Sequence, residues 1–278
     1  MTLVLSAIAA TLAAAIAGLL SLFFILPDWW PLWVSVLAGL AYSVADQYSD
    51  AEQTLLEVAE ARVATQHDEP ELHRLVERVA GMFDVASPQV ALAGAEIPSG
   101  FVVGTRSHRA VVAVSDEIRA KLDPAELEAV LAHELAHLAN RDAIVMTVAS
   151  LPRTIGLQLF ASDWIVLWFF LWPFGFLLYA LGSLLTRTIS RYREYAADAG
   201  AALATGRADA LMSAIERLAA DIERIPDQDL RQVDPLSPFF MVGTGKHRRF
   251  ELISEHPPLE KRLARLATIA REMGKPSR

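Results

Sequence analysis

Five consecutive residues carry the side chains best suited to chemistry in this sequence: His133-Glu134-Leu135-Ala136-His137. Residues four apart lie on one face of an α-helix, so His133 and His137 can bind a single metal ion together. The carboxylate of Glu134 can then reach a water molecule beside the metal rather than the metal itself. This pattern predicts a zinc hydrolase with one Zn²⁺ per chain. The alternative is the solvated His/Glu face of an ordinary amphipathic helix.

The residues before this motif predict how its helix begins. Asp123-Pro124-Ala125-Glu126 provides an N-cap, a proline at the first helical position and the glutamate of a capping box. From there the sequence contains neither Gly nor Pro up to Ser150. We therefore expect the helix to run directly into the hydrophobic segment that follows.

Two histidines do not complete a catalytic zinc site, which normally has three protein ligands and a water. Ala143 occupies the position, six residues after the second histidine, where a metzincin has its third. The candidates for the third ligand are Asp142, Glu194, Asp198, His247 and His256. Glu194 and Asp198 stand out because they share the four-residue spacing of the histidines. The alternative for their segment is an exposed charged face whose residues pair with one another.

The composition predicts where this chemistry takes place. The chain is 53% hydrophobic and has a mean hydropathy of +0.31 although 21% of its 278 residues are charged, which indicates membrane spans joined to a polar domain. The expected spans are residues 3–26, 29–44, 143–160 and 164–185. The third is the weakest, because Pro152-Arg153 interrupts it. The alternative for the last pair is a buried hairpin of a soluble enzyme.

The distribution of charge predicts the orientation. Arginines flank the ends of the spans away from the connectors near Asp28 and Asp163, so the positive-inside rule places both termini and His133 on the cytoplasmic side. The absence of cysteine is consistent with a cytoplasmic catalytic domain. The net charge of −8 argues against a nucleic-acid partner.

The fold class that we predict is mainly α with a small β-sheet: a multi-span membrane protein that carries a gluzincin-like catalytic domain. The expected helices in its polar parts cover residues 50–65, 69–83, 207–224 and 258–273. The expected strands cover residues 89–93, 100–104 and 110–115. The predicted domains are two spans at 1–45, a first catalytic part at 46–142, a transmembrane hairpin at 143–186 and a second catalytic part at 187–278.

These features together resemble the HtpX-type membrane zinc metalloproteases, relatives of the CAAX-processing membrane proteases. The resemblance covers nearly the whole chain. Its best marks are residues 133–137 with Asn140-Arg141-Asp142, and the segment of residues 190–198. The resemblance implies that His133, His137 and Glu194 bind zinc. It makes Glu134 the general base and places Asp198 behind a metal-binding imidazole.

The resemblance also implies two features of substrate binding. His256, in a His-Pro pair, would stabilise the tetrahedral oxyanion, although the pair could equally be a surface turn. The strand Phe101-Val102-Val103 would lie beside the substrate, whose backbone would add to the edge of the sheet. Ser99 stands where the family has asparagine, so this chain departs from the family pattern at that position.

The resulting expectation is a quality-control endopeptidase in the inner cell membrane of a prokaryote. Its partners would be polypeptides, above all misfolded or flexible membrane proteins, and the lipid bilayer. No oligomeric state is predicted. A prenyl-protein processing protease would share the site but needs more spans. A non-catalytic membrane scaffold that retains the motif is the other alternative. Charged residues before the motif and the lack of a downstream Leu-Asp-Gly exclude an intramembrane protease of the site-2 kind.

Overall fold

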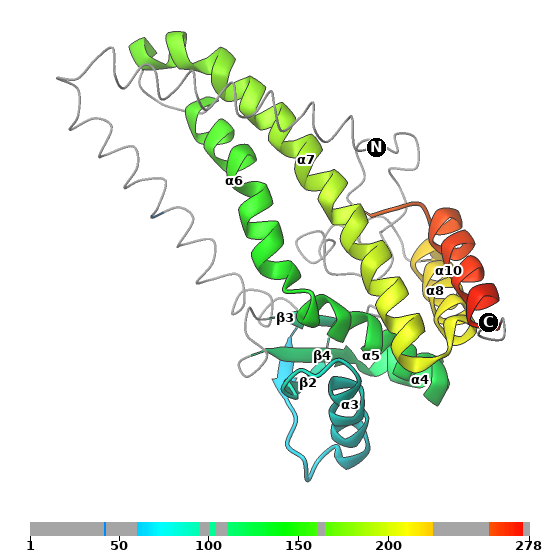
Figure 1. The fold of residues 1–278 in the computed structure, drawn as a ribbon. Helices are drawn as coiled ribbons and strands as arrows, with labels where there is room; N and C mark the ends of the chain where they lie inside the picture. Colours follow the sequence, from blue (N-terminus) through cyan, green and yellow to red (C-terminus); the bar gives the residue numbers. More distant parts are fainter. Residues whose placement is uncertain are drawn as a thin grey trace. The chain divides into compact units, whose positions relative to one another are not determined.

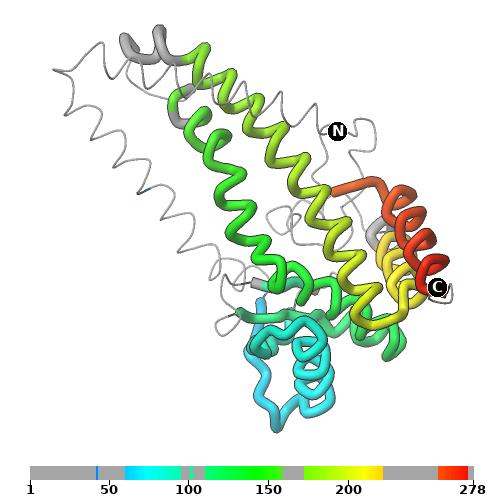
Figure 2. The backbone as a smooth tube through the Cα atoms, viewed as in Figure 1, coloured from blue at the N-terminus to red at the C-terminus, as the bar shows by residue number. Residues whose placement is uncertain are grey.

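The chain divides into two compact units in the computed structural model. One unit contains Met1–Ala51 and Val145–Ile189, and we call it the helical unit. The other contains Glu52–Ile144 and Ser190–Arg278, and we call it the mixed unit because it holds a sheet as well as helices. The structure describes Tyr42 and residues 60–94, 100–103, 110–160, 165–224 and 256–274 (Figure 2).

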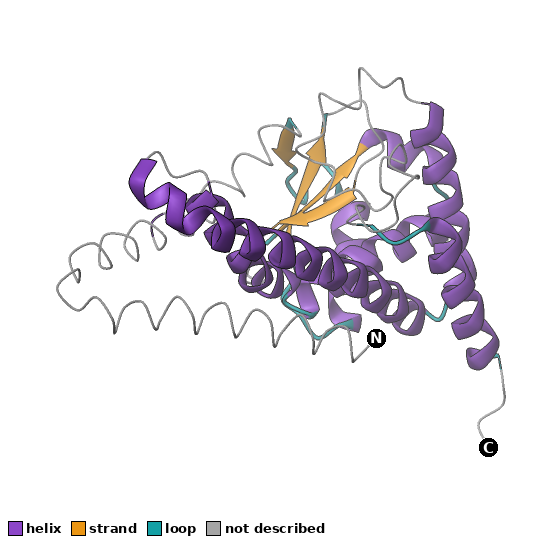
Figure 3. Ribbon diagram, turned by 90° about the horizontal axis from the view of Figure 1, so that it is seen from above, coloured by secondary structure: helices purple, strands orange, loops and turns teal. Residues whose placement is uncertain are grey.

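The sheet of the mixed unit has four strands in the order β1-β2-β4-β3. They are β1 (Ala61–Val63), β2 (Gln89–Ala93), β3 (Gly100–Val103) and β4 (Val111–Ser115), drawn in orange in Figure 3. β2 and β4 are parallel, and the outer strands β1 and β3 pair antiparallel with them. The three predicted strands are confirmed, and β3 is an edge strand.

The helix expected at residues 50–65 is wrong at its C-terminal end. Ala61–Val63 instead forms β1, which pairs with β2 through Ala61 and Ala93 at one end and Val63 and Ala91 at the other. The pairing satisfies backbone groups along the outer edge of β2, and this non-local gain outweighs the helical pattern of a short segment. The rest of the expected helix lies outside the described residues.

Helix α5 (Pro124–Ala139) carries the His-Glu-x-x-His motif through the centre of the mixed unit. The Asp123 side chain accepts hydrogen bonds from the N–H groups of Ala125 and Glu126, and the Glu126 side chain accepts one from the Asp123 N–H. The predicted capping box is therefore confirmed. The helix contacts β3, α3 (Pro70–Met82) and α8 (Ala208–Arg224), so its histidines lie between the sheet and the helices.

The expected continuous helix from Pro124 to Ser150 is wrong, because α5 ends at Ala139 and α6 (Asp142–Phe160) begins after a turn. Arg141 has φ 56°, in the left-handed region, which breaks the helix. The N–H groups of Asn140 and Arg141 donate to the carbonyl oxygens of Ala136 and Leu138 and so satisfy the helix end. Neither Gly nor Pro announces this turn in the sequence.

The remaining helices of the mixed unit bring the C-terminal part of the chain to α5. Helix α7 (Ile165–Thr205) is 41 residues long and belongs to this unit from Ser190 onward. Gly206, with φ 70°, makes the turn into α8, and α10 (Leu259–Met273) packs on α8 (Figure 1). The predicted helices at 69–83, 207–224 and 258–273 are confirmed within a residue at each end.

In the helical unit, α6 and the first part of α7 pack closely because glycines allow it. A Cβ added at Gly156 would lie 2.3 Å from the backbone N of Tyr179, and one added at Gly182 would lie 2.4 Å from that of Arg153. The Thr186 hydroxyl donates to the carbonyl oxygen of Ala149 across the same contact. Backbone therefore meets backbone at this helix crossing.

We expect Gly182→Ala to destabilise the protein, because its methyl group would overlap the α6 backbone, which cannot move like a flexible side chain. Overpacking of this kind costs about 1–3 kcal/mol or more and should lower the thermal midpoint by roughly 5 °C or more. Gly81→Ala in α3 is the matched control, because nothing lies within 4 Å of its added Cβ. Equal midpoints for the two variants, measured by circular dichroism, would contradict the close crossing.

Four membrane spans were expected, and this expectation is not confirmed. Within the part of the chain that the structure describes, no helix combines the length and the apolar composition that crossing a membrane requires. The spans predicted at residues 3–26 and 29–44 lie outside the described residues.

Candidate metal centre

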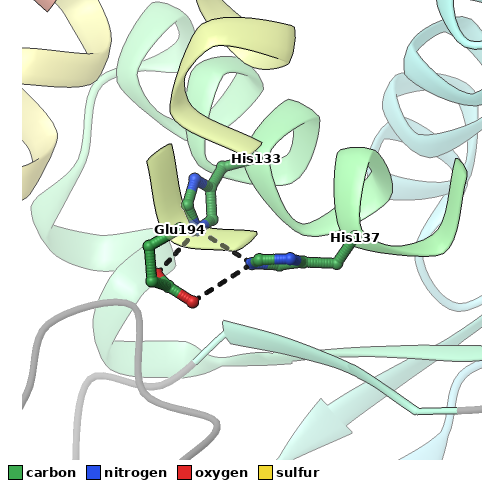
Figure 4. Close-up of side chains that lie close together, drawn as sticks. All are labelled: His133, His137 and Glu194. Atoms are coloured by element: carbon green, nitrogen blue, oxygen red, sulfur yellow. Dashed lines mark hydrogen bonds and ion pairs between the residues drawn. The ribbon is translucent and has the colours of Figure 1, made fainter. Parts of the chain in front are cut away.

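Three side chains from two helices converge in the mixed unit (Figure 4). The ring nitrogens Nε2 of His133 and His137, one turn apart on α5, lie 3.2 Å from each other. Glu194 on α7 places Oε2 at 3.6 Å from His133 Nε2 and Oε1 at 3.6 Å from His137 Nε2. The possible ligand atoms of the three residues all lie within 4.8 Å of one another. This is the trio that the resemblance to a known family implied.

The spacing of these atoms fits a metal ion. Two ligand atoms that each lie about 2.0–2.1 Å from a tetrahedral zinc ion are about 3.3–3.4 Å apart. The separations of 3.2 and 3.6 Å bracket that value. Among the described residues, none gives the buried Oε2 atom of Glu194 a hydrogen bond. A buried carboxylate oxygen without a hydrogen bond, beside two imidazole nitrogens, belongs to a donor set that suits a cation.

A carboxylate lies behind each imidazole. Asp142, at the start of α6, has Oδ2 at 2.6 Å from His137 Nδ1. Asp198, one turn beyond Glu194 on α7, has Oδ1 at 3.0 Å from His133 Nδ1, although the direction of this contact falls short of an ideal hydrogen bond. Such carboxylates fix which ring nitrogen carries the proton and leave the other for a metal. The turn at Arg141 is what brings Asp142 back to His137.

Each of these carboxylates is in turn paired with an arginine. Arg262 on α10 binds Asp198 through two contacts, Nε to Oδ2 at 2.8 Å and Nη2 to Oδ1 at 2.6 Å. Arg193 on α7 has Nε at 3.2 Å from Asp142 Oδ2. Behind each of the two histidines there is therefore a series of contacting groups: imidazole, carboxylate and guanidinium.

Burial and these contacts together shift the pKa values of the acidic groups. Burial opposes the charge of Glu194, but the nearby imidazole of His133 and the charge of His137 outweigh it and hold the pKa of Glu194 well below its usual value. Burial likewise opposes the charge of Asp198, while Arg262 and His133 lower the pKa of Asp198 to about 2. Both carboxylates are therefore ionised at neutral pH.

The pKa values of the two histidines shift in opposite directions. Burial disfavours the imidazolium of His133, yet the adjacent carboxylates of Asp198 and Glu194 outweigh burial and raise the pKa of His133 to about 9. For His137, burial prevails over the hydrogen bond to Asp142 and lowers the pKa below its usual value. The cluster thus holds a proton on His133 where a metal ion would otherwise supply positive charge.

The overall charge of the cluster also suits a divalent ion. The carboxylates and guanidiniums gathered around the histidines are Glu134, Asp142, Glu194, Asp198, Arg193 and Arg262. In this described set, four carboxylates face two guanidiniums. Once a bound cation displaces the protons of His133 and Glu134, the set carries two more negative than positive charges, which a divalent ion would balance.

Glu134 lies in this cluster without belonging to the trio of His133, His137 and Glu194. Its side chain is buried, and burial is the main cause that raises the pKa of Glu134 to about 8, against the charge of His133. The backbone of Val102 in β3 forms a hydrogen bond with its carboxylate. The edge strand predicted to hold substrate therefore contacts the predicted general base. Phe101, its neighbour, is buried in the core.

His256 also lies at the centre, just before α10. Its side chain is buried, and its Nδ1 atom lies 4.0 Å from Glu194 Oε2. Burial among charged groups is not what an exposed surface turn would give, so the structure disfavours that alternative. His247, the remaining candidate for the third ligand, lies outside the described residues.

Sequence reasoning missed the two arginines and the support that Asp142 gives to His137. A signal for Arg262 exists in the pattern of α10. The apolar residues Leu259, Leu263 and Leu266 form its buried stripe, and Arg262 lies within that stripe rather than on the opposite face. A charged residue on the apolar face of a helix indicates a buried partner. Arg193 carries no comparable signal, because Arg187 and Arg191 precede it and make it one more member of a basic segment.

Comparison with known proteins agrees with this geometry. The family described as peptidase family M48 matches residues 66–270. The chain is 35% identical to the protease HtpX homolog 2 of Methanosarcina acetivorans over 87% of this chain and 86% of the relative. It is 38% identical to the protease HtpX homolog 1 of Streptomyces coelicolor, over 87% of this chain and 84% of the relative.

A solved structure shares the fold. The crystal structure of S. mikatae Ste24p matches with a TM-score of 0.58 at 20% sequence identity. The match covers 93% of this chain and 64% of the Ste24p chain, so this protein spans less than two thirds of that structure. The sequence matches, which extend through the histidine motif and Glu194, carry the assignment: the chain belongs to peptidase family M48 and is an HtpX-like metalloprotease that acts on polypeptides.

Proposed function

We propose that the protein is a membrane-bound, zinc-dependent endopeptidase that cleaves misfolded or flexible membrane proteins at the cytoplasmic face in protein quality control. The observation that carries the proposal is the convergence of His133, His137 and Glu194 beside the buried carboxyl group of Glu134. Two imidazoles and a carboxylate are the ligands of many catalytic zinc sites, which leave a fourth position for water. The donor set favours zinc, one per chain, over Mg²⁺ or Ca²⁺, which prefer oxygen ligands.

The chain's own residues have distinct roles in the proposed reaction. The bound ion would polarise the scissile carbonyl and lower the pKa of a water molecule. Glu134 takes a proton from the attacking water and delivers it to the leaving amine. His256 donates a hydrogen bond to the oxyanion that develops on the carbonyl oxygen. Asp142 and Asp198 hold the two imidazoles in the tautomer that presents Nε2 to the centre.

The edge strand β3 is the proposed place for the substrate backbone. An extended peptide that pairs with Val102 and Val103 would run past Glu134, because the backbone of Val102 already contacts that carboxylate. A peptide bond inside a helix has its carbonyl committed to the helix and its approach blocked by side chains. The enzyme must therefore take flexible or unfolded segments.

The membrane location is supported by apolar side chains in the helical unit. Large hydrophobic residues there are exposed, namely Val145, Val148, Leu157, Phe174 and Leu177. Soluble proteins rarely expose so many on neighbouring helices. We propose that residues 1–45 and 143–186 form the membrane part in the inner membrane of a prokaryote, and that residues 46–142 and 187–278 form the protease in the cytoplasm, with a role in stress response.

The test compares unfolded and folded forms of a single-span reporter protein in proteoliposomes with the purified enzyme. We expect the unfolded form to be cleaved at several sites and at least about tenfold faster, because only a flexible segment can add to β3. Glu134→Gln serves as the control for contaminating proteases. Equal cleavage of both forms would contradict the quality-control role. Strict dependence on one short motif would instead favour a processing enzyme.

A further inference from the structure

We propose that Arg262 is a positioning residue of the metal centre, which fixes Asp198 and, through Asp198, the ring of His133. Helix α10 would then be part of the apparatus that holds the metal, although it contributes no ligand. This inference rests on the proposed metal site, and it assigns a role that the histidine motif and the Glu194 segment do not contain.

The geometry gives Arg262 control over the position of Asp198. Its guanidinium meets both carboxylate oxygens, at 2.8 and 2.6 Å, in the two-pronged arrangement that fixes the carboxylate plane. The oxygen at 2.6 Å is Oδ1, the atom that lies 3.0 Å from Nδ1 of His133. Rotation of the Asp198 carboxylate would therefore break its contact with the arginine and its contact with the imidazole together.

The same contact determines which nitrogen of His133 faces the metal. The oxygen that Arg262 holds faces Nδ1 of His133 at 3.0 Å. A carboxylate in this position favours a proton on Nδ1 and leaves the lone pair of Nε2 for the metal. The third nitrogen of Arg262, Nη1, lies 3.7 Å from Oε2 of Glu194, so the guanidinium also faces the carboxylate ligand.

Stability alone does not account for an arginine at this position. The side chain is only 2% exposed and lies among the apolar residues of the α10 stripe. Removing a guanidinium from water is costly, and a buried ion pair is often no more stabilising than apolar side chains of similar size. A leucine or methionine at this position would continue the stripe. The charge is instead directed at the two carboxylates that flank His133.

The series His137–Asp142–Arg193 differs in one respect from the series His133–Asp198–Arg262. That difference makes Arg262 the more informative residue to change. Arg193, which pairs with Asp142, neighbours Glu194 on α7 and is 20% exposed. Arg262 comes from α10, a separate helix that otherwise packs on α8. Its contact with Asp198 therefore links the C-terminal helix to the centre, and a defect there acts without any change in the helices that carry the ligands.

The experiment measures metal binding by the purified full-length variants Arg262→Met, Arg262→Lys and Asp198→Asn. Zinc affinity is obtained by competition with a chromogenic chelator, and the visible spectrum of the Co²⁺-loaded protein reports the ligand geometry. We expect Arg262→Met to weaken zinc binding by about 10–100-fold and to alter the Co²⁺ spectrum. Arg262→Lys should recover part of the affinity, since it keeps the charge but loses the two-pronged contact. Arg271→Met, an exposed change on the same helix, is the control and should match the wild type.

Two further comparisons separate the possible outcomes. Combining Arg262→Met with Asp198→Asn should weaken zinc binding no more than the stronger single change, because both act on one contact. Wild-type affinity and spectrum in Arg262→Met or Arg262→Lys, with only a lower thermal midpoint, would reduce the arginine to a structural role. If Arg262→Met does not fold, Arg262→Lys and Asp198→Asn still decide the question. Glu194→Gln tests the site itself, so unchanged zinc binding there would overturn the proposed function rather than this inference alone.

Discussion

Replacing Glu134 with glutamine is expected to abolish measurable peptide cleavage while the protein keeps its fold and its metal. Glutamine preserves the volume and most of the hydrogen bonding of the side chain, but it cannot accept a proton. Loss of a general base costs about 10²–10⁴ in rate, and more when the same residue positions the water. The measurement is kcat/KM for an unfolded substrate such as casein, with the metal content determined on the same samples.

The matched control for this change is Glu128→Gln on the same helix. Glu128 pairs with Arg78 at 3.1 Å, away from the metal centre, so its loss should leave the rate close to that of the wild type. A surface ion pair of this kind contributes less than about 1 kcal/mol to stability. Cleavage by Glu134→Gln within threefold of the wild type, at equal metal content, would rule out the general-base role.

Replacing Glu194 with alanine is expected to empty the metal site under conditions that leave the wild type loaded. Two imidazoles without the carboxylate hold a metal ion weakly, because the third ligand and its negative charge are lost together. Asp198→Ala removes only the support of His133 and should weaken binding by about 10–100-fold. The measurement is the metal retained after dialysis against a chelator.

Glu216→Ala, an exposed change on α8, is the control for nonspecific loss of metal. If Asp198→Ala empties the site and Glu194→Ala does not, the ligand and the supporting residue have been interchanged. If both variants retained as much metal as the wild type, neither residue would belong to the metal centre.

The structure brings together the three residues that the sequence analysis named as metal ligands, and each of them lies in a local pattern. The spacing of His133 and His137 places them on one face of a helix whose start is announced by Asp123 and Glu126. The resemblance then identified Glu194 among the open candidates, and the structure brings it to within 3.6 Å of both imidazoles. Helical periodicity and capping are short-range properties, so they can be read without the fold.

The parts that could not be predicted depend on contacts between distant segments or on backbone conformation. The break between α5 and α6 arises at Arg141, whose left-handed conformation has no signal in a sequence without Gly or Pro. That turn determines where Asp142 lies, so its support of His137 was missed as well. The strand at Ala61–Val63 forms because β2 offers it an edge, which is information that a local pattern does not contain.

Arg262 lies between the features that a local sequence pattern predicts and those that depend on the fold. Its place on the apolar stripe of α10 indicates that it has a buried partner, but not which one. Only the packing of α10 places the guanidinium against Asp198 and near Glu194. The sequence pattern could thus have singled out Arg262, but only the fold shows which residue it pairs with.

The central claim is that His133, His137 and Glu194 together bind zinc. The most direct test is an anomalous difference map from crystals of the purified protein, with data collected on both sides of the zinc absorption edge. We predict one peak per chain, present only above the edge, about 2.0–2.1 Å from Nε2 of both histidines and about 2.0–2.2 Å from a carboxylate oxygen of Glu194. A peak at other residues, or no zinc peak in protein that is active and shown to contain zinc, would contradict the account.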